Sequence, residues 1–250
     1  KKGRAGQNAF LLEGWTLLLE ALSRGAEPQL VVFRGGEAAS GGCIGSADDG
    51  RGGLEDLRMA VLREDLFDRL SDTVTPGAVL SVVTKPDFGP DALRGGSCVI
   101  LDRLQDPGNV GTIIRTAEAA GMTGVIAVKG TADIWSQKVC RSAAGALLRL
   151  PVIAADGARE ALELVRSLGM RPVRCDMNGT SLYETGALDG DVAFIIGNEG
   201  GGISKEFADA VPDAVCVPMA AGSESLNAAV AAAIVMYEKR RVDGSRLSAG

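Results

Sequence analysis

Residues 101–121 read LDRLQDPGNVGTIIRTAEAAG, and the fold of the second half of the chain follows from this stretch. A short apolar run, Cys98–Leu101, leads into it and predicts a strand. Residues 106–109 are of the types that form turns and cap helix N-termini. From Val110 onward the apolar residues recur at helical spacing. The stretch therefore predicts a strand, a tight loop and a helix, with Arg115 carried on that helix among small residues.

Apolar runs alternate with helical patterns throughout the rest of the chain. We expect strands at 97–102, 124–128, 173–176, 192–196 and 214–217. We expect helices at 110–120, 134–141, 158–168, 204–210 and 226–241. Apolar strands that alternate with helices indicate an α/β fold with a parallel sheet covered on both faces. Ligands bind such sheets at the loops beyond the carboxyl ends of the strands.

The amino-terminal part predicts a smaller α/β unit. We expect a helix at 10–22, one or two helical pieces at 54–70 with 63–72 as the better-defined part, and strands at 29–33 and 78–83. Residues 35–53 are rich in Gly, Ser, Ala and Asp, which predicts a loop to which we assign no function. The predicted boundaries are an N-terminal domain at 1–88, a Pro- and Gly-rich linker at 89–96, a C-terminal domain at 97–242 and a tail at 243–250.

Composition excludes several classes of protein. The chain has no histidine, which removes Ser-His-Asp and Cys-His catalysis. Its five cysteines are widely spaced and form no CxxC pair, so we expect neither a disulfide framework nor a metal site. No apolar run is long enough for a membrane span, and Lys1-Lys2 is not followed by a secretory signal, so we expect a cytoplasmic protein. The net charge of −6 argues against a surface coated in positive charge but leaves room for a local basic patch.

Two further loops follow predicted strands and lead into helices. The first contains GNEGGG at 197–202, where four glycines suggest a backbone bent closely round a neighbour. It is neither a Walker A nor a GxGxxG sequence, so a phosphate cradle has little support. The second runs from CVPM at 216–219 to SLN at 225–227 and precedes a helix of small residues. An ordinary buried helix capped by Ser225 or Asn227 is the simpler interpretation of that second loop alone.

Taken together and in this order, the three stretches resemble the motifs of the SpoU-type RNA ribose 2′-O-methyltransferases of the SPOUT superfamily. The matching motifs are Asn109-x-Gly111-x-x-x-Arg115-Thr116-Ala117, Ile196-Gly197-Asn198-Glu199-Gly200-x-Gly202, and Val217-Pro218-Met219 followed by Ser225-Leu226-Asn227. The amino-terminal part is similar to the substrate-binding domain of that family through FLLEG at 10–14 and LSDT at 70–73.

This resemblance implies a fold, a cofactor and partners. The C-terminal domain should contain a trefoil knot formed by its last helix, and its loops should bind S-adenosylmethionine in a bent conformation. The protein should be a homodimer through that domain, with catalytic groups contributed across the interface. Its substrate should be RNA, with ribosomal RNA favoured by the two-domain layout, and it should need neither a membrane nor a metal.

The resemblance also assigns residues. Those matched to cofactor-binding positions are Ile196, Gly197, Val217, Met219 and Leu226. Those matched to catalytic positions are Asn109, Arg115, Glu199, Ser225 and Asn227. Arg141, beside a segment similar to one near the active site of the family, and Arg4, in a basic amino-terminal arm, are candidates for contact with RNA.

Arg115 is the matched catalytic arginine, but a guanidinium stays protonated in proteins and is a poor base. We therefore expect Arg115 to hold the adjacent phosphate and to stabilise negative charge developing on the ribose oxygen. Water, a phosphate oxygen or Glu199 remains open as the proton acceptor.

Three alternatives remain at this point. The protein could methylate transfer RNA, or it could be a non-catalytic RNA-binding protein with the same fold. Titration with the methyl donor, followed by transfer of labelled methyl to total RNA, separates an enzyme from a binding protein. A dehydrogenase is the third hypothesis, but the chain lacks the glycine fingerprint of dinucleotide-binding folds.

Overall fold

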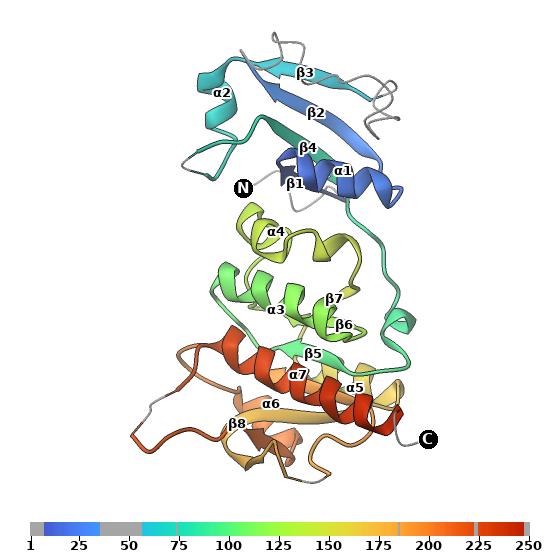
Figure 1. Ribbon diagram of the computed structural model, residues 1–250, viewed down its shortest axis with the longest axis vertical. Coiled ribbons are helices and arrows are strands. Elements are labelled where there is room, and N and C mark those ends of the chain that lie inside the picture. Colours follow the sequence, from blue (N-terminus) through green and yellow to red (C-terminus); the bar gives the residue numbers. More distant parts are fainter. Residues whose placement is uncertain (1–7, 36–56, 74, 185, 223–224, 248–250) are drawn as a thin grey trace.

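The computed structural model describes residues 8–35, 57–73, 75–184, 186–222 and 225–247. Within these residues the chain forms two sheets, a four-stranded sheet from its first part and a six-stranded sheet from its second (Figure 1). The predicted loop at 35–53, apart from Gly35, and the predicted basic arm with Arg4 lie outside the described residues.

The six-stranded sheet is parallel throughout, with the strand order β10-β8-β9-β5-β6-β7. Its strands are β5 (Cys98–Leu101), β6 (Gly124–Val128), β7 (Val152–Ala155), β8 (Arg171–Ser181), β9 (Val192–Ile196) and β10 (Ala214–Cys216). This confirms the predicted α/β fold with a parallel sheet.

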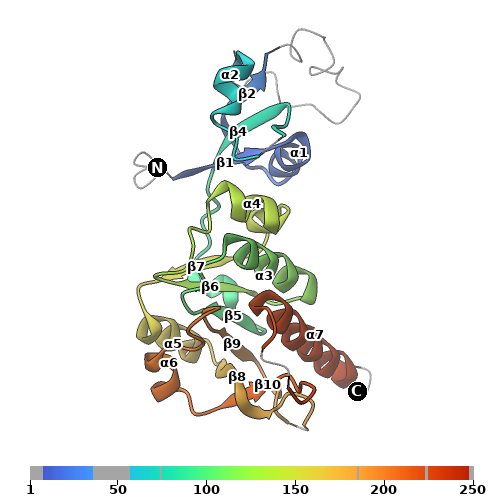
Figure 2. The ribbon, with the colours of Figure 1, turned by 90° about the vertical axis from the view of Figure 1, so that its left-hand side faces the viewer.

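Helices cover both faces of this sheet, as the turned view shows (Figure 2). One face carries α3 (Pro107–Ala120), α4 (Gln137–Ala143) and α7 (Ala228–Leu247), and the other carries α5 (Ala158–Ser167) and α6 (Lys205–Ala210). Alternation along the central strand explains the two cores, because Val99 and Leu101 face α3 while Cys98 and Ile100 face α5.

Several boundaries differ from those predicted, each for a local reason. Helix α3 begins at Pro107 rather than at residue 110, because the side chain of Asp106 accepts a hydrogen bond from the Asn109 N–H at 2.9 Å and caps the helix. Helix α4 begins after Ser136, which caps it, rather than at residue 134. Helix α7 continues to Leu247, through residues that the sequence assigned to a tail.

The four-stranded sheet has the order β1-β4-β2-β3, formed by β1 (Ala9–Glu13), β4 (Val79–Thr84), β2 (Pro28–Arg34) and β3 (Met59–Leu62). Helices α1 (Trp15–Ser23) and α2 (Glu64–Asp68) pack on its two faces. The prediction of a single helix at 10–22 is wrong, because Gly14 takes a left-handed φ of 101° and ends a strand there. The helical prediction at 54–70 is wrong at β3, whereas its better-defined part at 63–72 contains α2.

One of the hydrophobic cores extends from the six-stranded sheet to the four-stranded sheet. Phe10 and Leu12 of β1 and Val83 of β4 belong to the same buried cluster as Val139 of α4. Both ribbon views place α4 between the four-stranded sheet and α3 (Figures 1 and 2). The predicted linker also contains a short 3₁₀ helix, η3 (Pro90–Leu93), whose Leu93 is buried against the six-stranded sheet.

The described residues contain no group of three His, Cys, Asp or Glu side chains that could hold a metal ion. Among the described residues, Cys98, Cys140, Cys175 and Cys216 form no disulfide bond. No helix in the described ranges combines the length and apolar character that crossing a bilayer requires.

Candidate active site

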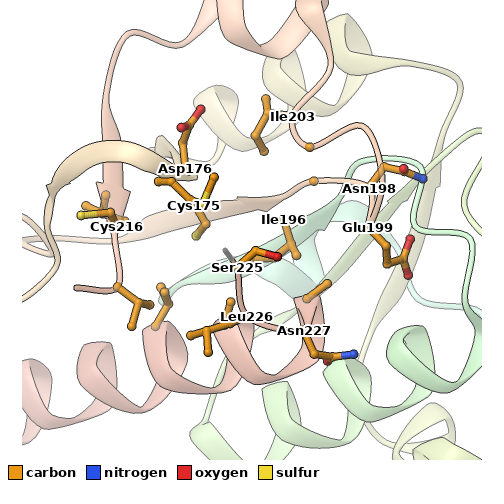
Figure 3. A pocket seen from close by; sticks show the side chains of 18 of the residues that line it. Cys175, Asp176, Ile196, Asn198, Glu199, Ile203, Cys216, Ser225, Leu226 and Asn227 are labelled. Carbon is orange, nitrogen blue, oxygen red and sulfur yellow. The ribbon is translucent and has the colours of Figure 1, made fainter. Parts of the chain in front are cut away.

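A cavity of about 640 Å³ opens between β8 and the loops that follow β9 and β10 (Figure 3). We call it the β8–β10 pocket. It is lined by Cys175, Asp176, Met177, residues 196–203, Val215, Cys216, Val217, Met219, residues 225–228, Ala231 and Val235. It lies at the carboxyl ends of parallel strands, where this class of sheet binds ligands.

The residues matched to cofactor binding all line this pocket, namely Ile196, Gly197, Val217, Met219 and Leu226. Three of the residues matched to catalysis line it as well, namely Glu199, Ser225 and Asn227. The structure thus brings together eight side chains or backbone positions that are up to 31 positions apart in sequence.

Asn109 stands behind the pocket and joins two of its loops. Its side-chain N–H donates to Glu199 Oε1 at 3.0 Å, and its Oδ1 accepts from Asn227 Nδ2 at 3.0 Å. Asn227 in turn accepts from the Ala229 N–H at 2.9 Å at the start of α7. One amide therefore fixes the loop after β9 to the beginning of α7.

Glu199 also receives hydrogen bonds from the backbone N–H groups of Gln105 and Asp106, at 3.0 and 3.2 Å. Partial burial acts to raise the pKa of the Glu199 carboxyl, but the hydrogen bonds from Asn109 and these N–H groups outweigh it and hold the pKa below its usual range. At neutral pH Glu199 is therefore a carboxylate whose oxygens already accept several donors.

Gly197 is required by the shape of its own loop. A Cβ there would lie 2.5 Å from the Ile203 nitrogen and 2.6 Å from the Gly202 oxygen. The loop is folded back by two backbone hydrogen bonds between Asn198 and Gly202, at 2.8 and 2.9 Å. Its glycine run thus serves close contact within the loop, in addition to any contact with a ligand.

Arg115 does not line the pocket of its own chain. It lies exposed on α3, and within the described part of the chain no hydrogen bond or ion pair engages its guanidinium. Gly111, one turn earlier on α3, packs instead against α4, where its missing side chain leaves room for Ser142 and Val139. The small residues near Arg115 therefore serve the contact between α3 and α4.

Arg141 is engaged within the chain. Its Nη1 lies 3.7 Å from Glu13 Oε2, and only 32% of its side chain is exposed. The structure therefore places this candidate for RNA contact against the four-stranded sheet.

Sequence reasoning missed two residues that shape the site. Asp102 directly follows β5 with its side chain 1% exposed, and its Oδ2 accepts from the Ser204 N–H at 2.6 Å. Asn198 donates to the Arg103 carbonyl at 2.8 Å and accepts from the N–H groups of Gly200 and Gly201. An aspartate directly after an all-apolar strand was the available signal for the first of these.

The chain matches the model of the SpoU rRNA Methylase family over residues 96–237. It is 33% identical over 241 residues to the 23S rRNA (guanosine(2553)-2'-O)-methyltransferase RlmP of Bacillus subtilis, covering 96% of this chain and 92% of that protein. An uncharacterised tRNA/rRNA methyltransferase of Synechocystis is 32% identical, covering 96% of this chain and 86% of that protein.

Solved structures give the same result. The AdoMet-bound rRNA methyltransferase of Sinorhizobium meliloti superimposes with a TM-score of 0.78 at 27% identity, covering 94% of this chain and 88% of that one. The SpoU methyltransferase AviRb of Streptomyces viridochromogenes, in complex with AdoMet, has a TM-score of 0.78 at 25% identity, covering 95% of this chain and 92% of that one. The family match covers more than half of the chain and includes all three motifs, so this protein belongs to the SpoU rRNA methylase family.

Proposed function

We propose that this protein transfers a methyl group from S-adenosylmethionine to a ribose 2′-hydroxyl of RNA, with ribosomal RNA as the substrate. The observation that carries the proposal is the convergence of all three motifs on or directly behind one pocket. Family membership and the RNA 2′-O activity in the name of the Bacillus subtilis relative support it.

The β8–β10 pocket suits the methyl donor in size and chemistry. Its volume of about 640 Å³ lies within the range of cofactor sites. Ile196, Val217 and Leu226 offer apolar walls for an adenine ring, and the glycine-rich loop offers backbone donors and acceptors for its edge. Asp176 lines the same pocket, with its carboxylate paired to Arg174 at 2.9 Å. When bound, S-adenosylmethionine supplies an electrophilic methyl group.

In this proposal Arg115 acts on the RNA. Its guanidinium, exposed and without a partner among the described residues, is available to hold a phosphate beside the target ribose. From there its charge would stabilise negative charge that develops on the 2′-oxygen. Much of the acceleration would come from holding the hydroxyl in line with the methyl group.

The hydrogen bonds of Glu199 favour a positioning role for this residue. A carboxylate with a lowered pKa, which already accepts from Asn109, Gln105 and Asp106, is a poor acceptor for a further proton. A water molecule or a phosphate oxygen is the better candidate for the proton acceptor.

The proposal includes a homodimer in which Arg115 of one chain serves the pocket of its partner. In support, α7 exposes Val230 and Tyr237 on one side, 48% and 50% exposed, while its other side packs against the sheet and α3. Leu226, which lines the pocket shortly before α7, is also exposed. A second copy that covers this face would bury apolar surface and bring an arginine to a pocket that lacks its own.

The remaining expectations also stay part of the proposal. These are the trefoil knot, an RNA-binding role for the amino-terminal unit, and a cytoplasmic location. The two loops that a knot would interlace, 197–204 and 217–227, share one pocket, in keeping with threading of α7. Knots are rare, so this expectation needs its own check. In mechanical unfolding, the extended length of a knotted chain pulled from both ends would be shorter than that of an unknotted chain.

The test is methyl transfer from a labelled donor to ribosomal RNA, with transfer RNA as a parallel substrate. The proposal predicts label in ribosomal RNA at a nucleotide whose 3′ bond becomes resistant to alkali, as 2′-O-methylation requires. Label on a base, or donor binding without any transfer, would contradict it. Label in transfer RNA alone would retain the chemistry and change the substrate.

A further inference from the structure

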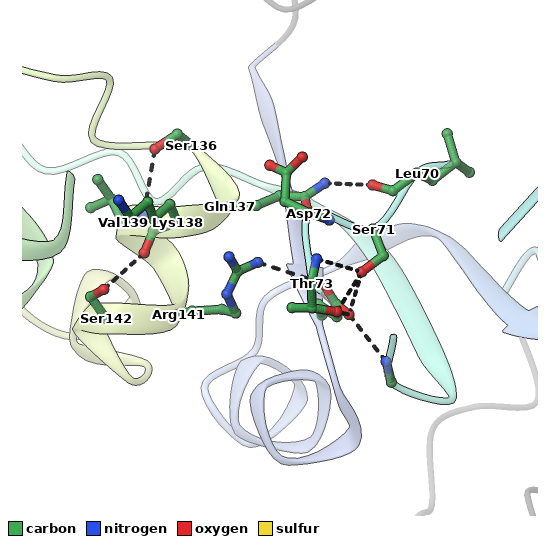
Figure 4. Close-up of polar contacts among 12 residues, drawn as sticks. Leu70, Ser71, Asp72, Thr73, Ser136, Gln137, Lys138, Val139, Arg141 and Ser142 are labelled. Atoms are coloured by element: carbon green, nitrogen blue, oxygen red, sulfur yellow. Dashed lines mark hydrogen bonds and ion pairs between the residues drawn. The ribbon is translucent and has the colours of Figure 1, made fainter. Parts of the chain in front are cut away.

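The four-stranded sheet is attached to α4 by a buried charged contact rather than by apolar packing alone (Figure 4). Glu13, at the end of β1, has a side chain that is only 5% exposed. A carboxylate at such a depth is costly unless its charge is compensated. The residues that compensate the charge of Glu13 therefore indicate the role of this contact.

The two oxygens of Glu13 have different partners. Oε1 accepts from the hydroxyls of Ser71 and Thr73, at 2.7 and 2.9 Å, and from the Gly77 N–H at 3.1 Å. These three donors lie in the same unit as Glu13 and fix the carboxylate in place. Oε2 accepts no hydrogen bond and lies 3.7 Å from the Nη1 of Arg141, which is likewise buried without an acceptor. The charge that compensates Glu13 thus comes from α4.

A second polar contact crosses the same junction beside the first. Gln137 of α4, 3% exposed, donates to the Leu70 carbonyl at 2.9 Å and accepts from the Asp72 N–H at 3.1 Å. Phe10 of β1 packs on Trp135, with ring centroids 4.8 Å apart, directly before α4. The segment at 70–73 is therefore held from both sides, by Glu13 and by Gln137.

Helix α4 passes this constraint to the proposed transfer site. Gly111 of α3 packs so closely on α4 that a Cβ there would lie 2.7 Å from the Val139 oxygen and 2.9 Å from the Ala143 nitrogen. Asn109 and Arg115 lie within two turns of Gly111 on the same helix. Because the two helices are in such close contact, a displacement of α4 would displace α3 as well.

We propose that Glu13 and Arg141 form a positioning pair that sets the place of the amino-terminal unit relative to the transfer site, so that bound RNA presents its target ribose at the right distance. This inference rests on the proposed function, and in particular on RNA binding by the amino-terminal unit. It assigns Arg141 to Glu13 rather than to RNA.

Neutralising Glu13 separates these two assignments. Glu13→Gln keeps an oxygen that can accept from Ser71, Thr73 and Gly77, but it removes the charge opposite Arg141. If the pair positions the RNA-binding unit, Glu13→Gln and Arg141→Gln should each raise the KM for RNA about tenfold, which is about 1.4 kcal/mol. The Kd for S-adenosylmethionine and the kcat at saturating RNA should stay within about twofold of the wild-type values, since the pocket is untouched.

A double variant and a control complete the design. Glu13→Gln combined with Arg141→Gln should be no worse than the more affected single variant, since both remove one interaction. Arg171→Gln removes an arginine that pairs with Asp213 at 3.0 Å far from the junction, and it should leave the KM for RNA unchanged. Gln137→Met loosens the same junction without a change of charge and should raise the KM in the same direction.

The outcomes are distinct. An unchanged or lowered KM in Glu13→Gln, with a raised KM in Arg141→Gln, would show that Arg141 contacts RNA directly and would overturn the inference. Unchanged KM values in both variants would overturn it as well. If either charge variant melts below the assay temperature, the KM of Gln137→Met decides, and an unchanged value contradicts the inference. Failure of the wild-type protein to transfer methyl would instead refute the proposed function.

Discussion

Glu199 joins the loop after β9 to the start of α3 through a single carboxylate. It accepts from the backbone at residues 105 and 106 and from Asn109, which also holds Asn227. The loop after β9, the segment before α3 and the start of α7 all depend on the Glu199 side chain. Its charge should therefore matter more for the shape of the pocket than for proton transfer. The consequence is measurable as a function of pH.

The lowered pKa of Glu199 predicts the sign of that dependence. A carboxyl whose pKa is lower in the folded state adds stability that is fully present above its unfolded pKa of about 4.3 and lost as pH falls through the folded value. Glu199→Gln should therefore be less stable than wild type at pH 7, by about 1 kcal/mol, because Glu199 is exposed and solvent screens its charge-assisted hydrogen bonds. The difference in Tm should shrink below about pH 4.3. Thermal unfolding from pH 3 to pH 7 checks this, and a difference that is constant across the range would contradict it.

Residues that act through sequence motifs could be found from the sequence, and residues that act through packing could not. The pocket-lining Gly197, Val217 and Leu226 follow from the resemblance to the family motifs. Asp102 belongs to none of these motifs, and the hydrogen bond that gives it a role joins positions 102 apart in sequence. The engagement of Arg141 by Glu13 joins positions 128 apart in sequence and was equally inaccessible.

At the scale of elements, the contact between α3 and α4 connects the four-stranded sheet with the site. It depends on a residue without a side chain, since the position of a Cβ at Gly111 is occupied by Ser142, Val139 and Ala143. Glycine within a helix is otherwise unfavourable relative to alanine. Its presence in the middle of α3 indicates that close packing outweighs helix propensity there.

Gly111→Ala should therefore destabilise the protein by about 1–3 kcal/mol through overpacking, despite the better helix propensity of alanine. Gly244→Ala is a matched control within α7, where a Cβ would meet no atom within 4 Å. It should be neutral or stabilise by up to about 1 kcal/mol. Denaturant unfolding of the two variants measures both effects. Equal stability of the two would mean that the α3–α4 contact can relax.

Whether a segment forms a helix or a strand could be predicted from apolar periodicity where the pattern was long. Helix α5 is an example, expected at 158–168 and observed at Ala158–Ser167. It failed where two short elements shared one apolar pattern, as in β1 and α1. Strand β7 (Val152–Ala155) was missed, because four apolar residues after a proline give no period to read. Pairing with β6 makes it a strand, and pairing is a tertiary property.

At the scale of the whole molecule, the single chain carries a pocket and an arginine that do not meet. The pocket is built by β8, the loops after β9 and β10, and the start of α7, whereas Arg115 lies on the exposed side of α3. Neither could be placed relative to the other from sequence, because in the proposed homodimer their relation depends on a second copy. The central claim is therefore that the site of methyl transfer is composed of one chain's pocket and its partner's arginine.

Mixing two inactive variants tests this claim most directly. Arg115→Ala should bind S-adenosylmethionine with near wild-type affinity but transfer no methyl, and Val217→Arg should fill the pocket and bind no donor. Chains of the two variants, unfolded together and refolded at equal amounts, should recover about 25% of wild-type transfer, because half of the dimers are mixed and each has one complete site. If the mixture, with its dimers verified by sedimentation, stays as inactive as either variant alone, the arginine acts within its own chain and the composite site is contradicted.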